Sequence, residues 1–257
     1  MWWRWSHKGA LVLPISAYEL PRERPDEVPV MRQSWRDLLF LHTPVEPAVI
    51  QSVLPARLTV DTYPDDSGRE WAWLAVVPFL MRNVCPVGAF TVPSLSNFSE
   101  TNLRTYFHLE GEDPGVWFFS LEASNRIACA IARHWYGLPY FAARMETRLR
   151  GETYDSSSVR HGAGAMTKIS ARIGEVRAMA EPGSLEFFLT ERYLLYSLRK
   201  ERLMQGQVWH SPYLLHDVSS FSIEETLSAQ ANVLANHYVH ALYSPGVKVF
   251  AYQPVEI

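Results

Sequence analysis

The chain has few lysines and cysteines for its length of 257 residues. Twenty of its 24 basic side chains are arginines, and a reaction that needs a lysine nucleophile has only four candidates. These lysines are Lys8, Lys168, Lys200 and Lys248. The two cysteines, Cys85 and Cys129, are too few for a disulfide framework and lack the spacing of a metal site. Two reduced, buried thiols are favoured over a single disulfide.

Long apolar runs and an excess of charge of one sign are also missing. The longest apolar run, residues 71–81, contains Pro78 and is far shorter than the roughly 20 residues of a membrane span. The first residues carry Arg4, Lys8 and Pro14 and match a signal peptide poorly. A net charge of −3 provides no basic field for nucleic acid or an anionic membrane. We therefore expect a cytoplasmic protein with neither as a partner.

Apolar side chains, by contrast, are abundant. The sequence is 47% hydrophobic, 13% aromatic and 20% charged, which is typical of a globular protein and excludes intrinsic disorder. Several prolines interrupt residues 1–30 and predict an extended N-terminal arm. Residues 31–257 contain no linker-like stretch and no repeat, so we expect one domain there, with a homo-oligomer left open.

Strand-like segments dominate the rest of the chain. Strands are predicted at 32–43, 57–61, 70–77, 103–110, 116–122, 166–174, 185–190 and 206–210, with a hairpin turn at 111–115. Helices are predicted at 46–54, at 125–136 and from Ser222, and a loop at 154–164. The pattern indicates a β-rich α+β domain with a few packed helices.

The helix at 125–136 has the strongest signals of the three. Ser124 is a candidate N-cap, and Gly137 followed by Pro139 ends the helix. Ile127, Ile131 and Trp135 recur four residues apart. We expect this stripe to pack against the sheet.

The most informative polar segment covers residues 97–107. On a strand, Glu100, Asn102, Arg104 and Tyr106 share one face, because side chains alternate. That face is either a solvated outer surface or the wall of a polar pocket, in which buried Glu100 and Arg104 would require mutual pairing or a charged ligand. The next predicted strand is apolar on both faces, which favours the pocket.

Other catalytic signatures are weak. His237 and His240 could share a helix face, but two isolated histidines are more often structural than metal ligands. The sequence has no G-x-S-x-G elbow, P-loop or dinucleotide fingerprint. We predict neither a metal nor a cofactor.

Several longer segments resemble the uncharacterised bacterial family DUF2071, also called YqjF-like. The matching runs are FLHTPVEPAVIQSVLPARLTVDT, ETNLRTYF, GVWFFSLEASNRIACAIARHWYGLPYFAARM, FLTERYLLYS and YSPGVKVF, within residues 31–253. The family is similar in fold to acetoacetate decarboxylase. The resemblance implies a mostly antiparallel, bent β-barrel of that type with an internal pocket, and Glu100 matches a pocket carboxylate of the decarboxylases.

The resemblance to the decarboxylases fails at the catalytic lysines. In those enzymes a Gly-x-Pro corner precedes two adjacent lysines, one of which forms a Schiff base. Here Gly137, Leu138 and Pro139 keep the corner, but Tyr140 and Phe141 follow it. A phenol cannot form an imine, so Schiff-base decarboxylation is excluded.

These observations lead to one functional hypothesis and one alternative. The first is a pocket that binds or converts a small carboxylate- or carbonyl-containing molecule. In it, Glu100 and Tyr140 are candidates for proton transfer, and the candidate binding residues are Asn102, Arg104, Tyr106 and Arg133. The alternative is a non-catalytic binding or assembly protein in which the same residues form a closed hydrogen-bond network. A cavity with Arg104 unpaired favours the first, and an Arg104–Glu100 ion pair the second.

Overall fold

The computed structural model describes residues 17, 18, 20–162, 164–235 and 237–257. Most of the expected N-terminal arm, residues 1–16 and 19, therefore lies outside the described residues. The remainder of the arm contains one turn of 3-10 helix, η1 (Leu20–Arg22). None of the helices in the described part of the chain has the length and apolar character needed to cross a membrane.

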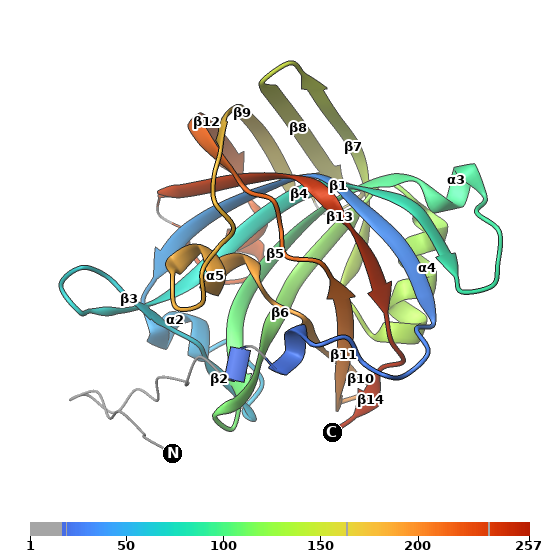
Figure 1. The fold of residues 1–257 in the computed structure, drawn as a ribbon, viewed down its shortest axis with the longest axis horizontal. Coiled ribbons are helices and arrows are strands. Elements are labelled where there is room, and N and C mark those ends of the chain that lie inside the picture. Colours follow the sequence, from blue (N-terminus) through green and yellow to red (C-terminus); the bar gives the residue numbers. More distant parts are fainter. Residues whose placement is uncertain (1–16, 19, 163, 236) are drawn as a thin grey trace.

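Strands make up most of the fold, and the helices are short (Figure 1). The strands are β1 (Met31–Val45), β2 (Leu58–Val60), β3 (Tyr63–Pro64), β4 (Glu70–Pro86), β5 (Phe98–Leu109), β6 (Glu112–Ala123), β7 (Tyr140–Arg150), β8 (Thr153–Arg160), β9 (Met166–Val176), β10 (Leu194–Arg199), β11 (Arg202–His210), β12 (His216–Glu225), β13 (His240–Ala251) and β14 (Val255–Glu256). The helices are α2 (Pro47–Gln51), α3 (Pro93–Ser96), α4 (Arg126–Tyr136), α5 (Leu185–Thr190) and α6 (Leu227–Gln230).

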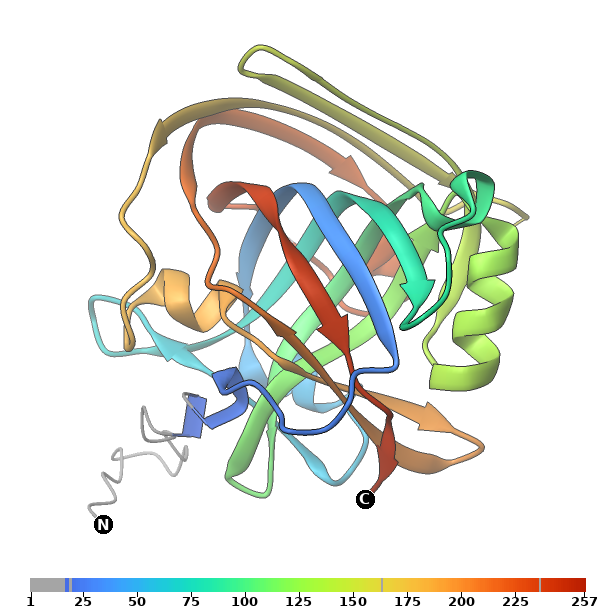
Figure 2. The ribbon, with the colours of Figure 1, turned by 45° about the vertical axis from the view of Figure 1, so that its right-hand side comes forward.

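The strands form a bent sheet whose pairings close into two rings. The first ring runs β1, β4, β5, β6, β10, β11, β13 and back to β1. The second ring runs from β6 through β7, β8, β9 and β12 to β13, and shares β13, β1, β4, β5 and β6 with the first (Figure 2). Only the β6–β7 and β6–β10 pairs are parallel within the described residues. This confirms the predicted mostly antiparallel, strongly bent α+β fold.

The strands shared by the two rings are buried on both faces. On β4, Trp73 and Val77 belong to one hydrophobic cluster, whereas Leu74 and Val76 belong to another. The first cluster fills part of the first ring, and the second packs against β8 and β9 of the second ring. The long apolar run at 71–81 is therefore a doubly covered strand, which explains why it does not alternate with polar residues.

Three secondary-structure predictions are wrong. The predicted loop at 154–164 is largely strand β8, whose polar residues Ser156 and Ser158 face a buried interior. The predicted strand at 185–190 is helix α5, because Ser184 caps it and its apolar run has no clear period. The predicted helix from Ser222 is strand β12, where pairing with β9 overrides the capping-box pattern.

The helix at 125–136 is present as α4, but its cap and its packing differ from the prediction. Asn125, rather than Ser124, is the N-cap, and its side chain accepts hydrogen bonds from two backbone amides of the first turn. The Ile127, Ile131 and Trp135 side chains are 55%, 47% and 60% exposed. The expectation that this stripe packs against the sheet is wrong, because α4 turns the side carrying buried Cys129 inward.

The end of α4 has the conformation that the sequence predicts. Gly137 has φ +64°, and a Cβ at this position would come within 3.0 Å of the Leu198 carbonyl oxygen on β10. Only glycine combines this left-handed backbone with so close an approach. The corner leads the chain directly into β7, whose first residue is Tyr140.

Candidate functional site

A cavity of about 670 Å³ lies within the first ring, between its shared strands and α4. Most of its lining is apolar or aromatic. Its buried or partly buried wall includes Trp35, Leu38, Val77, Phe79, Phe98 and Leu121. Its exposed rim includes Phe90, Leu95, Ile127, Ile131 and Trp135. The cavity therefore runs from an exposed apolar rim into the interior of the ring.

Strand β5 supplies the polar side chains at the inner end. Glu100, Asn102 and Arg104 line the cavity and are only 2%, 4% and 9% exposed. They share a face because strand side chains alternate, and Leu103, between two of them, belongs to the cluster of the second ring. Of the two interpretations of this face, the solvated outer surface is wrong, and three of its four polar side chains line the cavity.

Glu100 is a buried carboxyl without a cationic partner in the described part of the chain. Tyr140 donates a hydrogen bond of 2.8 Å to Glu100 Oε2. Burial raises the pKa of Glu100 to about 8, and the phenol hydrogen bond opposes only part of this rise. Glu100 is therefore mostly protonated at neutral pH.

Tyr140 is a hydrogen-bond donor rather than a base. Burial, followed by the neighbouring Glu100 carboxylate, raises the pKa of its phenol well above 10. Its hydroxyl keeps its proton at neutral pH and can orient the Glu100 carboxyl. Glu100 is thus the group of the pair that can exchange a proton near neutral pH.

Arg104 forms no ion pair within the described residues. Its Nη2 donates to the Leu189 carbonyl oxygen at 3.3 Å, and its Nε has no hydrogen-bond partner. Asn102 Oδ1 is also buried without a partner. Buried polar atoms nearly always have partners, so these two point to a ligand or bound water.

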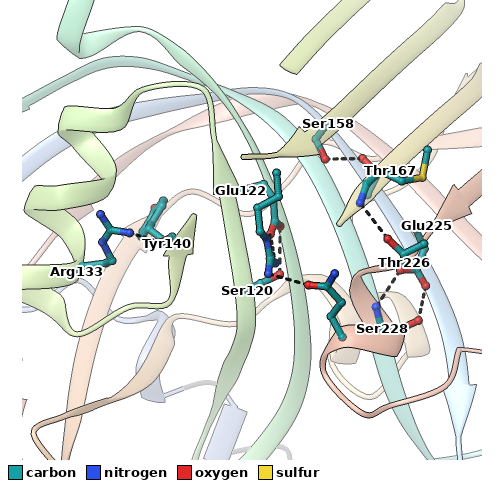
Figure 3. A network of polar contacts seen from close by, with 12 residues as sticks. Ser120, Glu122, Arg133, Tyr140, Ser158, Thr167, Glu225, Thr226 and Ser228 are labelled. Atoms are coloured by element: carbon teal, nitrogen blue, oxygen red, sulfur yellow. Dashed lines mark hydrogen bonds and ion pairs between the residues drawn. The ribbon is translucent and has the colours of Figure 1, made fainter. Parts of the chain in front are cut away.

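Two predicted binding residues lie beside the cavity rather than on its surface. Tyr106 is fully buried, and its hydroxyl donates to the Leu189 carbonyl oxygen at 2.8 Å. The same oxygen accepts from Arg104, so Tyr106 helps to position the acceptor of Arg104. Arg133 is exposed on α4 and donates to the backbone oxygen of Tyr140 at 3.2 Å (Figure 3). Neither belongs to the cavity lining, and we assign neither to ligand binding.

Sequence reasoning missed three polar or aromatic side chains of the cavity. Gln33 and Trp35 of β1 line it with Oε1 and Nε1 unpartnered, and Tyr213 lines it from the loop after β11. The spacing of Gln33 and Trp35 is a usable signal, because residues two apart on a strand share one face. Nothing in the local sequence indicates that Tyr213 returns to this ring.

Neither the described lysines nor the cysteines supply a reactive nucleophile to the cavity. Lys168, Lys200 and Lys248 are exposed and line no part of the cavity, and Lys8 lies outside the described residues. Both cysteines are free and buried, as predicted. Burial raises the pKa of the Cys129 thiol to about 11, so it is not a thiolate at neutral pH.

The predicted helical pair His237 and His240 does not form. His240 begins strand β13, and its Nδ1 lies 3.2 Å from Nδ1 of buried His42, whereas His237 is exposed. Among the residues that the structure describes, no three histidine, cysteine, aspartate or glutamate side chains are grouped to hold a metal ion.

The family model DUF2071, described as an uncharacterized conserved protein, matches residues 32–248. The chain belongs to the DUF2071 family. It is 36% identical over 197 residues to the uncharacterized protein YqjF of Bacillus subtilis (strain 168), covering 76% of this chain and 79% of that protein. The expected family is thereby confirmed.

Solved structures show where the fold of this DUF2071 protein recurs. Acetoacetate decarboxylase from Legionella pneumophila is similar with a TM-score of 0.64, 10% identity and 98% coverage of both chains. The enduracididine biosynthesis enzyme MppR, solved with the condensation product of pyruvate and imidazole 4-carboxaldehyde, is similar with a TM-score of 0.63, 14% identity and 90% coverage of both. At these identities the likeness establishes an acetoacetate decarboxylase-like fold and nothing further.

Proposed function

We propose that the cavity of the first ring binds a small molecule with a carboxylate or carbonyl group, and that no lysine takes part. The observation that carries the proposal is the pair of unpartnered buried polar atoms, Asn102 Oδ1 and Arg104 Nε, on the wall of a cavity of about 670 Å³. Leaving such atoms unsatisfied costs roughly 1–3 kcal/mol each, which a polar ligand group would recover.

Arg104 is the group suited to an anionic head. Its guanidinium can donate two parallel hydrogen bonds to a carboxylate, and no protein carboxylate among the described residues occupies it. Glu100 lies four residues away on the same strand face and, being protonated at neutral pH, places no repelling charge in the cavity. Asn102 offers an acceptor to a hydroxyl or enol group of the ligand.

If the ligand is converted, Glu100 is the candidate for the proton transfer. Its pKa of about 8 lies close to neutral pH, where general acid–base catalysis is most effective. Tyr140 would hold the carboxyl in place through its hydrogen bond. The pyruvate condensation product solved with MppR supports carbonyl and carboxylate ligands as a class that this fold can hold.

The alternative, a closed structural network, has less support. It requires an Arg104–Glu100 ion pair in a filled interior, whereas Glu100 contacts Tyr140 and Arg104 contacts a backbone oxygen. A network built for stability alone would also satisfy Asn102 and Arg104 Nε.

The test is a calorimetric and thermal-shift screen of monocarboxylates and keto acids against the wild type, Arg104→Lys and Arg104→Leu. Arg104→Lys keeps the charge and loses the planar fork, so we expect about tenfold weaker binding, and Arg104→Leu should weaken it further. Arg144→Leu, on the exposed side of β7, is the matched control and should bind like the wild type. Equal affinities in all four proteins, or no binding by any of them, would reject the proposed role of Arg104.

A further inference from the structure

The lining of the cavity is strongly asymmetric. Glu100, Asn102 and Arg104 all come from β5, whereas Gln33, Ser96 and His134 are the only other charged, amide or hydroxyl side chains apart from tyrosines among its described lining residues. The remaining wall is aliphatic and aromatic. A ligand with hydroxyl or amide groups along its length would leave them unpaired against such a wall.

The size of the cavity exceeds the needs of a small acid. At about 30 Å³ per water molecule, 670 Å³ corresponds to roughly twenty waters. A keto acid of four carbons would displace only some of them and leave the rest against apolar walls. Filling this space with apolar groups is favourable by about 25 cal/mol for each Å² of apolar surface removed from water.

The exposed face of α4 continues the apolar wall to the rim. Ile127, Ile131 and Trp135 are each about half exposed and also line the cavity. Asn125 ties this helix to α3 on the other side, because its side-chain amide donates to the Ser94 and Leu95 carbonyl oxygens at 3.0 and 3.2 Å. Helices α3 and α4 lie side by side (Figure 2), and exposed apolar residues of both line the rim of the cavity.

The charged side chains at the inner end of the cavity suit a ligand with a single negative charge. Arg104 is the single guanidinium or ammonium group among the described lining residues, and the Glu100 carboxyl lies four residues away on the same strand face. A phosphate dianion or a dicarboxylate would need a second cation. The head group is therefore a single carboxylate.

We propose that the ligand is an amphipathic monocarboxylic acid whose head reaches Asn102 and Arg104 and whose unbranched apolar body, of medium fatty-acid length, extends along the wall toward the rim of α4. This inference rests on the proposed function and adds the apolar body to it. It predicts that affinity depends on chain length as well as on the head group.

Titration calorimetry of the full chain with butanoate, hexanoate, octanoate and decanoate tests the inference, with 1-octanol as the probe that lacks the carboxylate. Each buried methylene should strengthen binding about fourfold. Octanol should bind at least tenfold more weakly than octanoate, because it cannot use the fork of Arg104.

A variant at the cavity rim measures the contribution of the ligand's apolar body separately from that of its carboxylate head. Ile131→Gln removes an apolar side chain at the rim, and Leu149→Gln is the control at a similarly exposed leucine of β7 that does not line the cavity. We expect Ile131→Gln to weaken decanoate binding about fivefold and to leave butanoate within twofold of the wild type. Leu149→Gln should change neither.

The outcomes distinguish this inference from the proposed function. Binding of short acids with no gain along the series overturns the apolar body and leaves the Arg104 site standing. Equal binding of octanol and octanoate overturns the carboxylate head, and with it the role of Arg104 in the proposed function. Failure of every acid to bind to folded protein rejects both.

Discussion

The two rings share strands, but the buried glutamate of one ring has an arginine partner and that of the other does not. Glu100 of β5 faces the cavity of the first ring, and Glu122 of β6 faces the interior of the second. Glu122 receives a 3.0 Å hydrogen bond from Arg160 Nε, a second contact from Arg160 Nη2, and one from the Ser120 hydroxyl. Glu100 receives a single phenol hydrogen bond.

Several other polar groups in the second ring are also paired, although Thr101 Oγ1 on this side of β5 has no partner. Ser158 and Thr167 share a hydrogen bond of 2.9 Å, and Glu225 accepts from the backbone and hydroxyl of Ser228 (Figure 3). Buried polar groups that satisfy one another stabilise and specify a structure. Glu100, by contrast, has no cationic partner among the described residues on the cavity side of the shared strands.

The largest expected effect comes from breaking the ion pair of the second ring. Arg160→Leu leaves Glu122 buried and unpaired, so the free energy of unfolding should fall by about 3–5 kcal/mol. Arg104→Leu leaves no carboxylate unpaired and should change the free energy of unfolding by less than about 1 kcal/mol. Urea denaturation of both variants measures the difference, and equal losses would contradict it.

A pH-dependent effect is expected at Glu100. The Glu100 carboxyl has a pKa near 4.5 in the unfolded chain and near 8 in the folded protein. Between these two pH values the unfolded chain releases the proton first, so the free energy of unfolding falls as the pH rises. Relative to Glu100→Gln, the wild type should lose about 1.4 kcal/mol per pH unit near pH 6, and roughly 2.3 kcal/mol in total from pH 6 to 8 because the slope falls as Glu100 ionises.

Urea denaturation of the Glu100→Gln variant across this range checks the expected loss. Glu181→Gln, at an exposed acid, is the control and should run parallel to the wild type. Parallel curves for Glu100→Gln as well would show that the Glu100 carboxyl is already ionised in the folded protein at pH 6.

A smaller effect is expected on α4. Ile131→Asp should change the free energy of unfolding by less than about 0.5 kcal/mol, because this side chain is 47% exposed. Leu121→Asp, at a buried position of the same cavity, should prevent folding or cost several kcal/mol. Thermal melts of both variants compare rim with wall, and unfolding of Ile131→Asp would contradict the outward placement of the stripe.

No effect at all is expected from acetoacetate with borohydride. Among the described residues, no lysine lines the cavity, so no imine can form there and no covalent adduct should be trapped. Intact-mass analysis followed by peptide mapping checks this expectation. An adduct on any of the four lysines, accompanied by release of carbon dioxide, would contradict it.

The sequence by itself determined the family, the β-rich class and the face of β5 that carries Glu100, Asn102 and Arg104. These features follow from local order, because alternation along a strand places residues two apart on one side whatever the surrounding fold. The absence of lysine after the Gly137–Pro139 corner was equally local, since Tyr140 and Phe141 directly follow it.

Only the tertiary structure decided which buried acid has a cation and which side of α4 is covered. Arg160 of β8 reaches Glu122 of β6 across the intervening strand β7. Arg104 and Glu100 share the cavity face but lie four residues apart along β5, about 13 Å, and form no ion pair. The apolar stripe of α4 satisfies the helical period and still lies at a cavity rim. A period reveals that a helix has an apolar face, but the contacts of that face depend on segments distant in the sequence.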